Sequence, residues 1–295
     1  MDKIGYAATI GTFDGVHRGH QFVLRRLVAE ACERGLLPLV VTFDASPRRE
    51  QVLTPLDEKL RLIRQAGVDH VEVLSFTPEL KAMTAREFMA RELCDRLGVR
   101  LLLTGYDNRF GRNRETFFDD YVRYGRELGV EVLGLPAEGA VSSSLIRQQL
   151  LAGAVDEAAE GLGRCYTISG HVAHGHHIGT GLGFPTANLI PDDPQQLIPA
   201  AGVYAVSVNG APSLRGMMNI GTRPTFDGHH TTLEVHILHH DEDLYGRPLS
   251  VSFVGRLREE RRFDGAAALQ QQLQQDALQT EQILSRYEES HHLSH

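Results

Sequence analysis

The 295-residue sequence has almost no lysine: Lys3, Lys59 and Lys81 are the only three. A phosphate bound by the second half must therefore be held by arginine, backbone N–H groups, a helix terminus or a metal ion. The P-loop motif GxxxxGK[ST] requires lysine, so it is excluded after residue 81, and no copy of it occurs earlier.

Cysteine is also scarce, and Cys32, Cys94 and Cys165 are scattered without CxxC spacing. This usage predicts free thiols in a reducing cytoplasm. No apolar run approaches the ~20 residues of a membrane span. The segment MDKIGYAATIG lacks the apolar core and cleavage site of a signal peptide. We therefore expect a cytoplasmic protein without membrane contact.

Positive charge is outnumbered, and the formal net charge is −8. Broad, sequence-independent binding of nucleic acid needs a basic surface, so we expect no nucleic-acid partner. The balance remains compatible with a local basic pocket. The length predicts two domains, and a hydrophobic fraction of 42% is ordinary for globular proteins.

Strand-like and helix-like segments alternate through the first half. This alternation implies right-handed crossovers and a parallel sheet, so we expect an α/β, Rossmann-like domain. The expected strands are 5–11, 36–43, 70–76, 100–105 and 130–135. The expected helices are 20–35, 56–67, 84–98, 117–128 and one that follows Ser144.

Strands dominate the second half. In 231–240, Leu233, Val235 and Ile237 alternate with Glu234 and His236. An Asn-Gly pair at 209–210 is a strong hairpin signal. Together with the strand-like runs 165–175, 202–221 and 249–258, these patterns predict an all-β barrel or sandwich, followed by a helix over about 266–287. The predicted domains are 1–162 and 163–287, with 288–295 as a frayed tail.

The stretch GTFDGVHRGH, residues 11–20, follows the first expected strand and leads into a helix. Ligands of α/β sheets bind at the carboxyl ends of strands, and a helix N-terminus attracts anions. We expect His17 and His20 to donate hydrogen bonds to phosphate oxygens and to stabilise charge on a phosphoryl group. The alternatives are an incidental turn and a zinc site, but no third zinc ligand stands nearby at suitable spacing.

Serines 142–144 come just before another helix, with Arg147 in its first turn. Serine commonly caps a helix, which is one interpretation. The other is a second anion site, in which Arg147 offers its planar guanidinium to phosphate.

These motifs resemble the HxGH and SSTxIR-type motifs of the nucleotidylyltransferase superfamily. The fuller pattern, with VVTFDASPR at 40–48 and LLTGYDNRFGRNR at 102–114, resembles the adenylyltransferase module of prokaryotic bifunctional riboflavin kinase/FMN adenylyltransferase. The family has Ser-Ser-Thr where this chain has three serines, and Ser144 keeps the hydroxyl. The resemblance implies ATP binding by Gly11, Phe13, Asp14, His17, Gly19, His20, Ser143, Ser144 and Arg147, with both histidines catalytic.

The resemblance also implies flavin-nucleotide binding by Asp44, Pro47, Asp107, Arg109 and Phe110. The family usually has Asp-Phe where this chain has Asp-Asn at 107–108, so Asn108 departs from its pattern. Independently, the arginines at 109, 112 and 114 concentrate positive charge. They form either a solvated loop or a surface that attracts a phosphorylated substrate.

A second glycine-rich stretch, HVAHGHHIGTGLGFPTANL, spans 171–189. Thr186 and Asn188 share one face if the segment is extended. Their neutral oxygens suit Mg²⁺ held partly by nucleotide phosphates, and the absence of lysine makes a metal more necessary.

This stretch resembles the riboflavin kinase module, whose glycine-rich loop runs into a PTAN motif. The likeness continues through GVYAVSV, NIGTRPTF, LEVHIL, DLYG and LREERRF, and the two modules cover about residues 6–287. It implies that Glu234 is the general base on the ribityl hydroxyl and that Arg258 binds the flavin, although a strand glutamate alone is usually just solvated. It implies kinase ATP binding by Gly175, Gly179, Gly183, Pro185, Thr186 and Asn188, with Thr186 and Asn188 also contacting Mg²⁺.

The second half is rich in histidine, which raises a structural zinc hypothesis. The spacing fits no compact tetrahedral motif, so zinc is not expected. The residues concerned are His171, His174, His176, His177, His236, His239 and His240.

We therefore expect a bifunctional enzyme that uses Mg²⁺. Its barrel transfers the γ-phosphate of ATP to riboflavin and gives FMN, and its α/β domain joins FMN to the AMP part of a second ATP and gives FAD. The partners are small molecules, and the sequence leaves the oligomeric state open. The alternatives are a nucleotidylyltransferase with another acceptor, a non-catalytic flavin-binding sensor, and an enzyme with one degenerate half.

Overall fold

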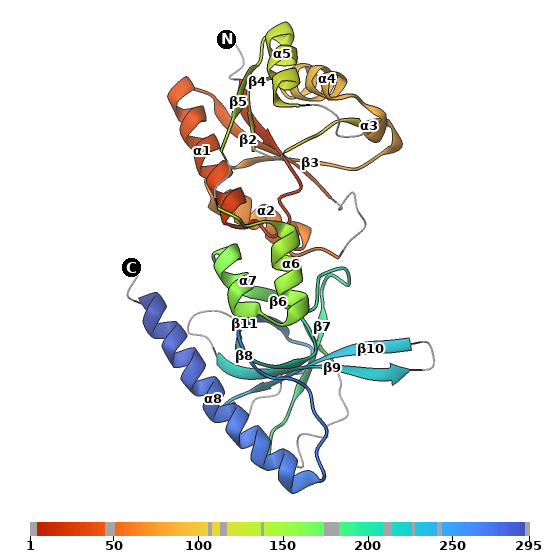
Figure 1. Cartoon of the computed structure of the whole chain (residues 1–295), viewed down its shortest axis with the longest axis vertical. Coiled ribbons are helices and arrows are strands. Elements are labelled where there is room, and N and C mark those ends of the chain that lie inside the picture. Colours follow the sequence, from red (N-terminus) through yellow and green to blue (C-terminus); the bar gives the residue numbers. More distant parts are fainter. Residues whose placement is uncertain are drawn as a thin grey trace. The chain divides into compact units, whose positions relative to one another are not determined.

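The chain forms two compact units, residues 1–143 and 144–295 (Figure 1). This division assigns the two helices that precede residue 163 to the second unit, and the predicted boundary at residue 162 stays a prediction. The computed structural model describes residues 5–44, 51–105, 108–112, 117–136, 139–173, 183–208, 214–225, 228–240 and 244–292.

A five-stranded parallel sheet, in the order β3-β2-β1-β4-β5, forms the centre of the first unit and confirms the predicted strands. The strands are β1 (Tyr6–Ile10), β2 (Leu37–Phe43), β3 (His70–Leu74), β4 (Val99–Thr104) and β5 (Glu131–Gly134). The helices are α1 (Arg18–Arg34), α2 (Leu56–Gln65), α3 (Pro78–Ala82), α4 (Ala85–Phe88), the π-helix η1 (Met89–Arg96) and α5 (Phe118–Leu128).

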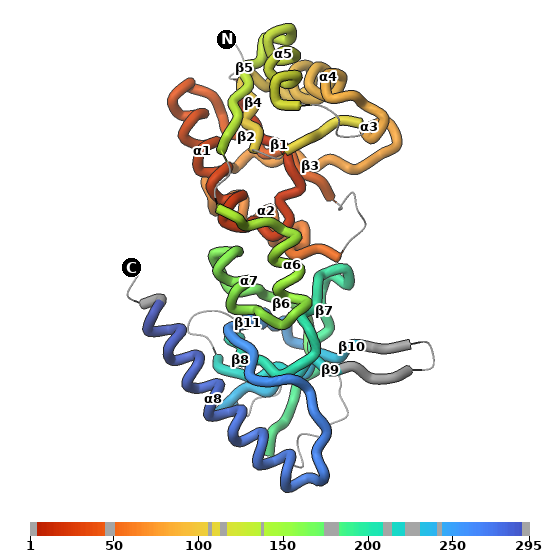
Figure 2. Tube along the Cα trace, in the orientation of Figure 1, coloured from red at the N-terminus to blue at the C-terminus, as the bar shows by residue number. Residues whose placement is uncertain are grey.

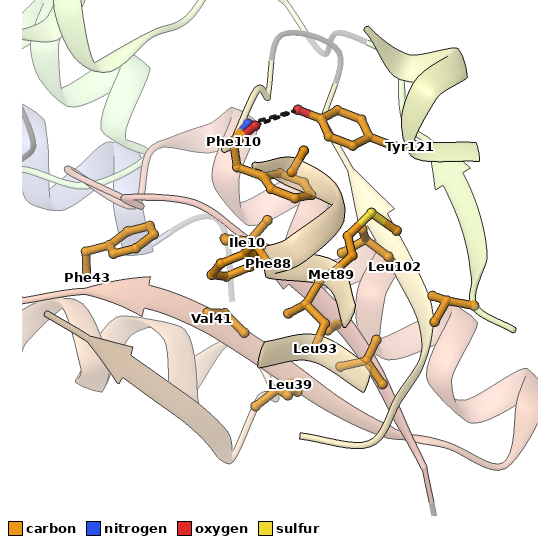
Figure 3. Close-up of a cluster of buried hydrophobic side chains, with 14 residues drawn as sticks. Ile10, Leu39, Val41, Phe43, Phe88, Met89, Leu93, Leu102, Phe110 and Tyr121 are labelled. Carbon is orange, nitrogen blue, oxygen red and sulfur yellow. Dashed lines mark hydrogen bonds between the residues drawn. The ribbon is translucent and has the colours of Figure 1, made fainter. Parts of the chain in front are cut away.

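Helices cover both faces of this sheet. Successive strand residues point to opposite sides, so the sheet has two apolar faces and each is packed against helices. On one face, Leu27 of α1 and Ile63 of α2 pack in a core with Val40. On the other face, Phe88 and Leu93 belong to a second core, in which aromatic and aliphatic side chains meet (Figure 3). This layering confirms the Rossmann-like α/β prediction.

The strand order reverses between β1 and β4. From β1 the chain passes through α1 to β2 on one side, whereas β4 lies on the other side. In open α/β sheets, ligands bind at such a switch point, outside the carboxyl ends of the strands. The motif 11–20 follows β1 and the predicted flavin segment follows β4, so both begin at this position.

The expected helix 84–98 is divided. Thr84 and Glu87 form a capping box at the start of α4, and the chain then widens into η1. Met89 and Leu93 are both fully buried. The wider π-turn keeps these residues, four positions apart, on the face that packs against the sheet.

The second unit contains a closed antiparallel barrel in the order β10-β7-β6-β11-β8-β9, which decides between the predicted barrel and sandwich. Its strands are β6 (Tyr166–Ala173), β7 (Ala187–Pro191), β8 (Gly202–Val208), β9 (Leu214–Thr225), β10 (Gly228–Ile237) and β11 (Pro248–Arg258). Its helices are α6 (Ser143–Ala152, whose first residue ends the first unit), α7 (Val155–Leu162) and α8 (Ala266–His292).

The alternation predicted for β10 is confirmed. Leu233, Val235 and Ile237 are buried, whereas Glu234 and His236 are only half-buried on the opposite face. β8 and β9 pair antiparallel, as a hairpin requires, although the Asn-Gly pair at 209–210 lies outside the described residues.

Helix α8 lies along β8, β9 and β11 (Figure 2). Asp276, Thr280 and Leu284 recur every four residues and are buried. The helix continues to His292, beyond the predicted end at Tyr287. No helix in the described ranges is long and apolar enough to cross a membrane.

Candidate active sites

The loop between β1 and α1 has an uncommon backbone conformation. Phe13 has a φ of 49°, Gly15 of 86° and Val16 of 39°. Positive φ is costly for a β-branched residue such as valine and persists only where the surroundings impose it. Phe13 and Val16 are both buried in the core beneath α1. Packing therefore fixes the course of the loop and the position of the histidines that follow.

The two predicted histidines stack at the start of α1. The ring centroids of His17 and His20 lie 3.7 Å apart, with an interplanar angle of 20°. His17 is the N-cap residue, and its Nδ1 accepts a hydrogen bond from the backbone N–H of His20 at 3.4 Å. A neutral imidazole carries one proton, so this arrangement leaves the proton of His17 on Nε2, as a donor.

Gly19 makes room for this stack. A Cβ atom at position 19 would lie 3.2 Å from Cε1 and 3.3 Å from Nδ1 of His17. These contacts would push the His17 ring away from its position. The glycine between the histidines of the HxGH pattern therefore has a steric reason.

The surroundings of His20 favour a neutral ring. Burial is the main cause that holds the pKa of His20 well below its usual value, and the charges of His17 and Lys59 add to it. The Nδ1 atom of His20 is buried and has no hydrogen-bond partner in the described part of the chain. Buried polar atoms are normally paired, so a substrate group or a water is the expected partner.

Asp14 and Ser143, both predicted ATP ligands, also brace the loop. The Oδ1 atom of Asp14 accepts hydrogen bonds from the backbone N–H groups of Leu53 at 2.8 Å and Thr54 at 3.3 Å. The hydroxyl of Ser143 donates to the backbone carbonyl of Asp14 at 2.8 Å. The motif is thus tied to the chain before α2 and to the serine motif.

Phe110, a predicted flavin-nucleotide residue, lies in the hydrophobic core. Its ring stacks on that of Tyr121, with centroids 4.5 Å apart (Figure 3). The Tyr121 hydroxyl accepts a hydrogen bond from the N–H of Phe110 at 2.9 Å and donates to its carbonyl at 3.2 Å. Tyr121 therefore fixes the backbone of the flavin segment. Sequence reasoning missed it because helical periodicity marks it only as a core residue.

Asn108, which departs from the family pattern, joins the two sides of the switch point. Its side-chain amide donates to the backbone carbonyl of Ile10, the last residue of β1. The guanidinium of Arg109 lies 5.1 Å from the centroid of the Phe117 ring. The carboxylate of Asp44 accepts a hydrogen bond from the hydroxyl of Ser75.

On the barrel, Asn188, Glu234 and Asn219 form one row across three adjacent strands. Glu234 of β10 is paired with Asn188 of β7 on one side and with Asn219 of β9 on the other. Directly paired residues of antiparallel strands point to the same face, with Cβ atoms ~5 Å apart. The predicted base and the predicted ATP ligand are therefore neighbours. Asn219 belongs to the quoted segment NIGTRPTF, but sequence reasoning gave it no role.

His236 holds the PTAN segment against β10. Its Nδ1 atom donates a hydrogen bond to the carbonyl of Pro185 at 2.7 Å, and its ring meets that of Phe184 edge-on. Burial lowers the pKa of His236, and the bond to Pro185 opposes that shift. The sequence shows His236 beside Glu234, but its partner is visible only in the fold.

Arg258, the predicted flavin ligand, pairs with Asp276 of α8. Its Nη2 and Nε atoms lie 2.8 Å and 3.0 Å from Oδ2 of that carboxylate. The Asp276 side chain is fully buried and that of Arg258 is 17% exposed. These contacts anchor α8 to the barrel, and the flavin role of Arg258 stays a prediction.

The predicted magnesium ligands have the right chemistry for this ion. Thr186 supplies a hydroxyl and Asn188, paired with Glu234, an amide oxygen, and Mg²⁺ prefers oxygen ligands shared with nucleotide phosphates. Within the described ranges, no group of three or more His, Cys, Asp or Glu residues gathers into a metal site. The zinc hypothesis also concerned His174, His176 and His177, which lie outside those ranges.

Other predicted site residues are not tested by these contacts. Ser144 and Arg147 lie on α6, the former exposed and the latter half-buried. Gly183 has a φ of 81°, and nothing in the described part of the chain lies within 4 Å of the position a Cβ atom would take. Four predicted residues lie outside the described part of the chain: Pro47, Asp107, Gly175 and Gly179.

Two family models match the chain, FAD synthetase over residues 1–144 and riboflavin kinase over residues 162–284. Both matches agree with the order of the motifs and with the two units of the fold.

Known proteins resemble nearly the whole chain. "Bifunctional riboflavin kinase/FMN adenylyltransferase" of Escherichia coli K12 is 39% identical over 287 residues, covering 93% of this chain and 91% of the relative. The protein of the same name from Pseudomonas fluorescens is 41% identical, covering 92% and 91%.

A solved structure, titled as a macrolide-efflux protein from Streptococcus pneumoniae, has a TM-score of 0.87 and 31% identity, and 95% of each chain is covered. The efflux activity named in that title refers to the Streptococcus pneumoniae protein and is not transferred to this chain. The identity and coverage of the curated relatives settle the family. The chain belongs to the bifunctional riboflavin kinase/FMN adenylyltransferases.

Proposed function

We propose that two separate sets of residues carry out the two reactions of this family in this chain. The enzyme phosphorylates riboflavin with ATP to FMN, and it adenylylates FMN with a second ATP to FAD and pyrophosphate. The observation that carries the residue assignment is the row formed by Glu234 and Asn188, because it joins a candidate base to a candidate nucleotide ligand.

In the kinase reaction, Glu234 accepts the proton of the ribityl hydroxyl as that oxygen attacks the γ-phosphorus of ATP. The bond from the γ-phosphorus to the bridging oxygen breaks, and ADP leaves. Thr186 and Asn188 would hold Mg²⁺ together with the phosphates, where the ion neutralises phosphate charge. His236 supports this segment through the carbonyl of Pro185.

In the adenylyltransferase reaction, a phosphate oxygen of FMN attacks the α-phosphorus of ATP, and pyrophosphate leaves. His17 and His20 donate hydrogen bonds to phosphate oxygens as charge shifts toward the leaving group. The predicted partners in ATP binding are Gly11, Phe13, Asp14, Gly19, Ser143, Ser144 and Arg147. The predicted flavin-nucleotide residues are Asp44, Pro47, Asp107, Arg109 and Phe110.

In the kinase unit, the predicted contacts with ATP further include Gly175, Gly179, Gly183 and Pro185, and Arg258 is the predicted flavin contact. The proposed location is the cytoplasm, and the three cysteines support it because all are free thiols. The proposed requirement for Mg²⁺ applies to both reactions.

Product analysis tests this function. Purified protein is incubated with riboflavin, ATP and Mg²⁺, and riboflavin, FMN and FAD are separated by chromatography; a second series starts from FMN. We expect FMN to appear first and FAD to follow, and chelation of Mg²⁺ to stop both. FMN alone would indicate a degenerate first unit, and FAD only from supplied FMN a degenerate second unit. Binding of flavin without any product would favour a sensor.

A further inference from the structure

Lys59 is a buried cation that the reactions described so far do not use. The residue lies on α2 and is 7% exposed. No other lysine, and no arginine, is buried in the described part of the chain. A buried ammonium is costly unless hydrogen-bonded, so its position calls for an explanation.

The ammonium joins the ends of two neighbouring strands. Its Nζ atom donates to the carbonyl of Phe43, the last residue of β2, at 2.7 Å. It also donates to the carbonyl of Thr12, just after β1, at 3.3 Å. The segments that leave these strands are the histidine motif and the predicted flavin segment that begins at Asp44. An ammonium has three donors, and no third partner of Lys59 is found in the described ranges.

Charged and titratable groups surround this cation at the carboxyl edge of the sheet. Burial lowers the pKa of Lys59, whereas the carboxylates of Asp14 and Asp44 raise it. Burial is the main cause that lowers the pKa of His20; the neighbouring His17 adds to the shift, and the charge of Lys59 adds the smallest part. The same ammonium therefore contacts the backbone that leads into both predicted binding segments and acts on a histidine of the predicted ATP motif.

We propose that Lys59 is a positioning residue for FMN adenylylation, because its ammonium ties together the loops after β1 and β2 and brings a positive charge to the histidine motif. This inference rests on the proposed role of the histidine motif. It adds a lysine from α2, a segment to which no sequence motif assigned a role in this site.

The test compares Lys59→Met, which keeps the length of the side chain without its charge, with Lys59→Arg, which keeps the charge. Lys81→Met is the matched control, because Lys81 is an exposed lysine of the same unit. FAD formation from supplied FMN is measured from pH 5 to 9, with riboflavin phosphorylation in the same preparations as a reference and hydrogen exchange of α1 as a check on folding.

We expect Lys59→Met to lower kcat for adenylylation at least tenfold and to leave riboflavin phosphorylation within twofold of wild type. Removal of the cation raises the pKa of His20, so the acidic limb of the rate profile should move to higher pH. Lys59→Arg should keep the wild-type limb even if its rate is reduced.

An unchanged rate in Lys59→Met would overturn the proposal. A reduced rate with an unmoved acidic limb would also overturn it, because a purely structural lysine gives that result. If hydrogen exchange shows that α1 loses protection in Lys59→Met, the test depends on Lys59→Arg. An acidic limb that is shifted in Lys59→Arg would contradict the proposal, and a limb at the wild-type pH would support it. If the wild-type chain and Lys81→Met form no FAD, the proposed function itself has failed.

Discussion

Glu234 and Asn188 face each other across the ladder between β10 and β7. The two residues lie 46 positions apart in the sequence, in motifs that suggest different tasks. The pairing places a proton acceptor beside an oxygen ligand for the nucleotide, which is what transfer of phosphate to a hydroxyl requires.

Glu234→Gln should therefore lower riboflavin phosphorylation by about 10²-fold or more, since the amide cannot accept the hydroxyl proton. FAD formation from supplied FMN should persist. Both rates are followed by chromatography, with the exposed Glu289→Gln as the control variant. Equal loss of both activities in folded Glu234→Gln would contradict two separate sites.

His17→Ala or His20→Ala should slow FAD formation from FMN about a hundredfold or more, the usual effect of losing one preorganised donor. Riboflavin phosphorylation should remain. His70→Ala changes an exposed histidine of the same unit and should leave both rates near wild type. A rate of FAD formation close to wild type in both motif variants would remove the histidines from the proposed mechanism.

Acid should destabilise the first unit through His20. Its pKa in the folded chain is held below the ordinary 6.5. Between these two values the unfolded chain binds a proton that the folded chain does not. The contribution of His20 to stability is therefore complete above pH 6.5 and declines as the pH falls toward the lowered pKa. The opening free energy measured by hydrogen exchange of the first-unit amides should fall less between pH 8 and pH 5 in His20→Gln than in wild type. An equal fall in the two proteins would contradict this account.

Tyr121→Phe removes the hydroxyl that pairs with both backbone groups of Phe110. A buried polar group left without a partner costs about 1–3 kcal/mol, so the unfolding free energy of the first unit should fall by that amount. The KM for FMN should rise as the segment loosens. Chemical denaturation and FMN titration measure the two effects, and Tyr124→Phe serves as the control. An unchanged KM for FMN would indicate that the Phe110 segment does not contribute to flavin binding.

Gly170→Ala should disturb the barrel. A Cβ atom there would lie 2.1 Å from the carbonyl oxygen of Ile190 on β7, the strand that carries Asn188. The strands must separate, which we expect to cost about 2 kcal/mol of stability or more and to reduce kinase activity. Gly265→Ala is the matched control, because nothing lies within 4 Å of its Cβ position. Thermal unfolding that is the same in the two variants would refute the prediction.

The sequence was sufficient for most strands because their patterns are local. In β10, alternation alone identified the buried face. Barrel closure was not predictable in the same way, because it requires β10 to pair with β7, and residues 192–227 separate the two strands. No local pattern distinguishes that pairing from a sandwich. The division of one helix into α4 and η1 likewise depends on packing against the sheet.

The same difference between local patterns and long-range contacts applies to the candidate sites. His17 and His20 stand out by residue type and spacing, whereas Glu234 was identified only through the resemblance to the riboflavin kinase module. Lys59 and Tyr121 act through contacts with distant backbone groups, which spacing does not encode. One signal for Lys59 was available: it stands four residues before buried Ile63, on the inner face of α2.

The pair formed by Arg258 and Asp276 has a consequence for any shortened form of the chain. A polypeptide ending before residue 276 would retain every barrel strand and every candidate kinase residue. It would also leave the largely enclosed guanidinium of Arg258 without its counter-charge, which should destabilise the second unit. Premature stop codons between residues 266 and 276 should therefore appear as failures of protein accumulation in the cell, with the catalytic residues themselves untouched.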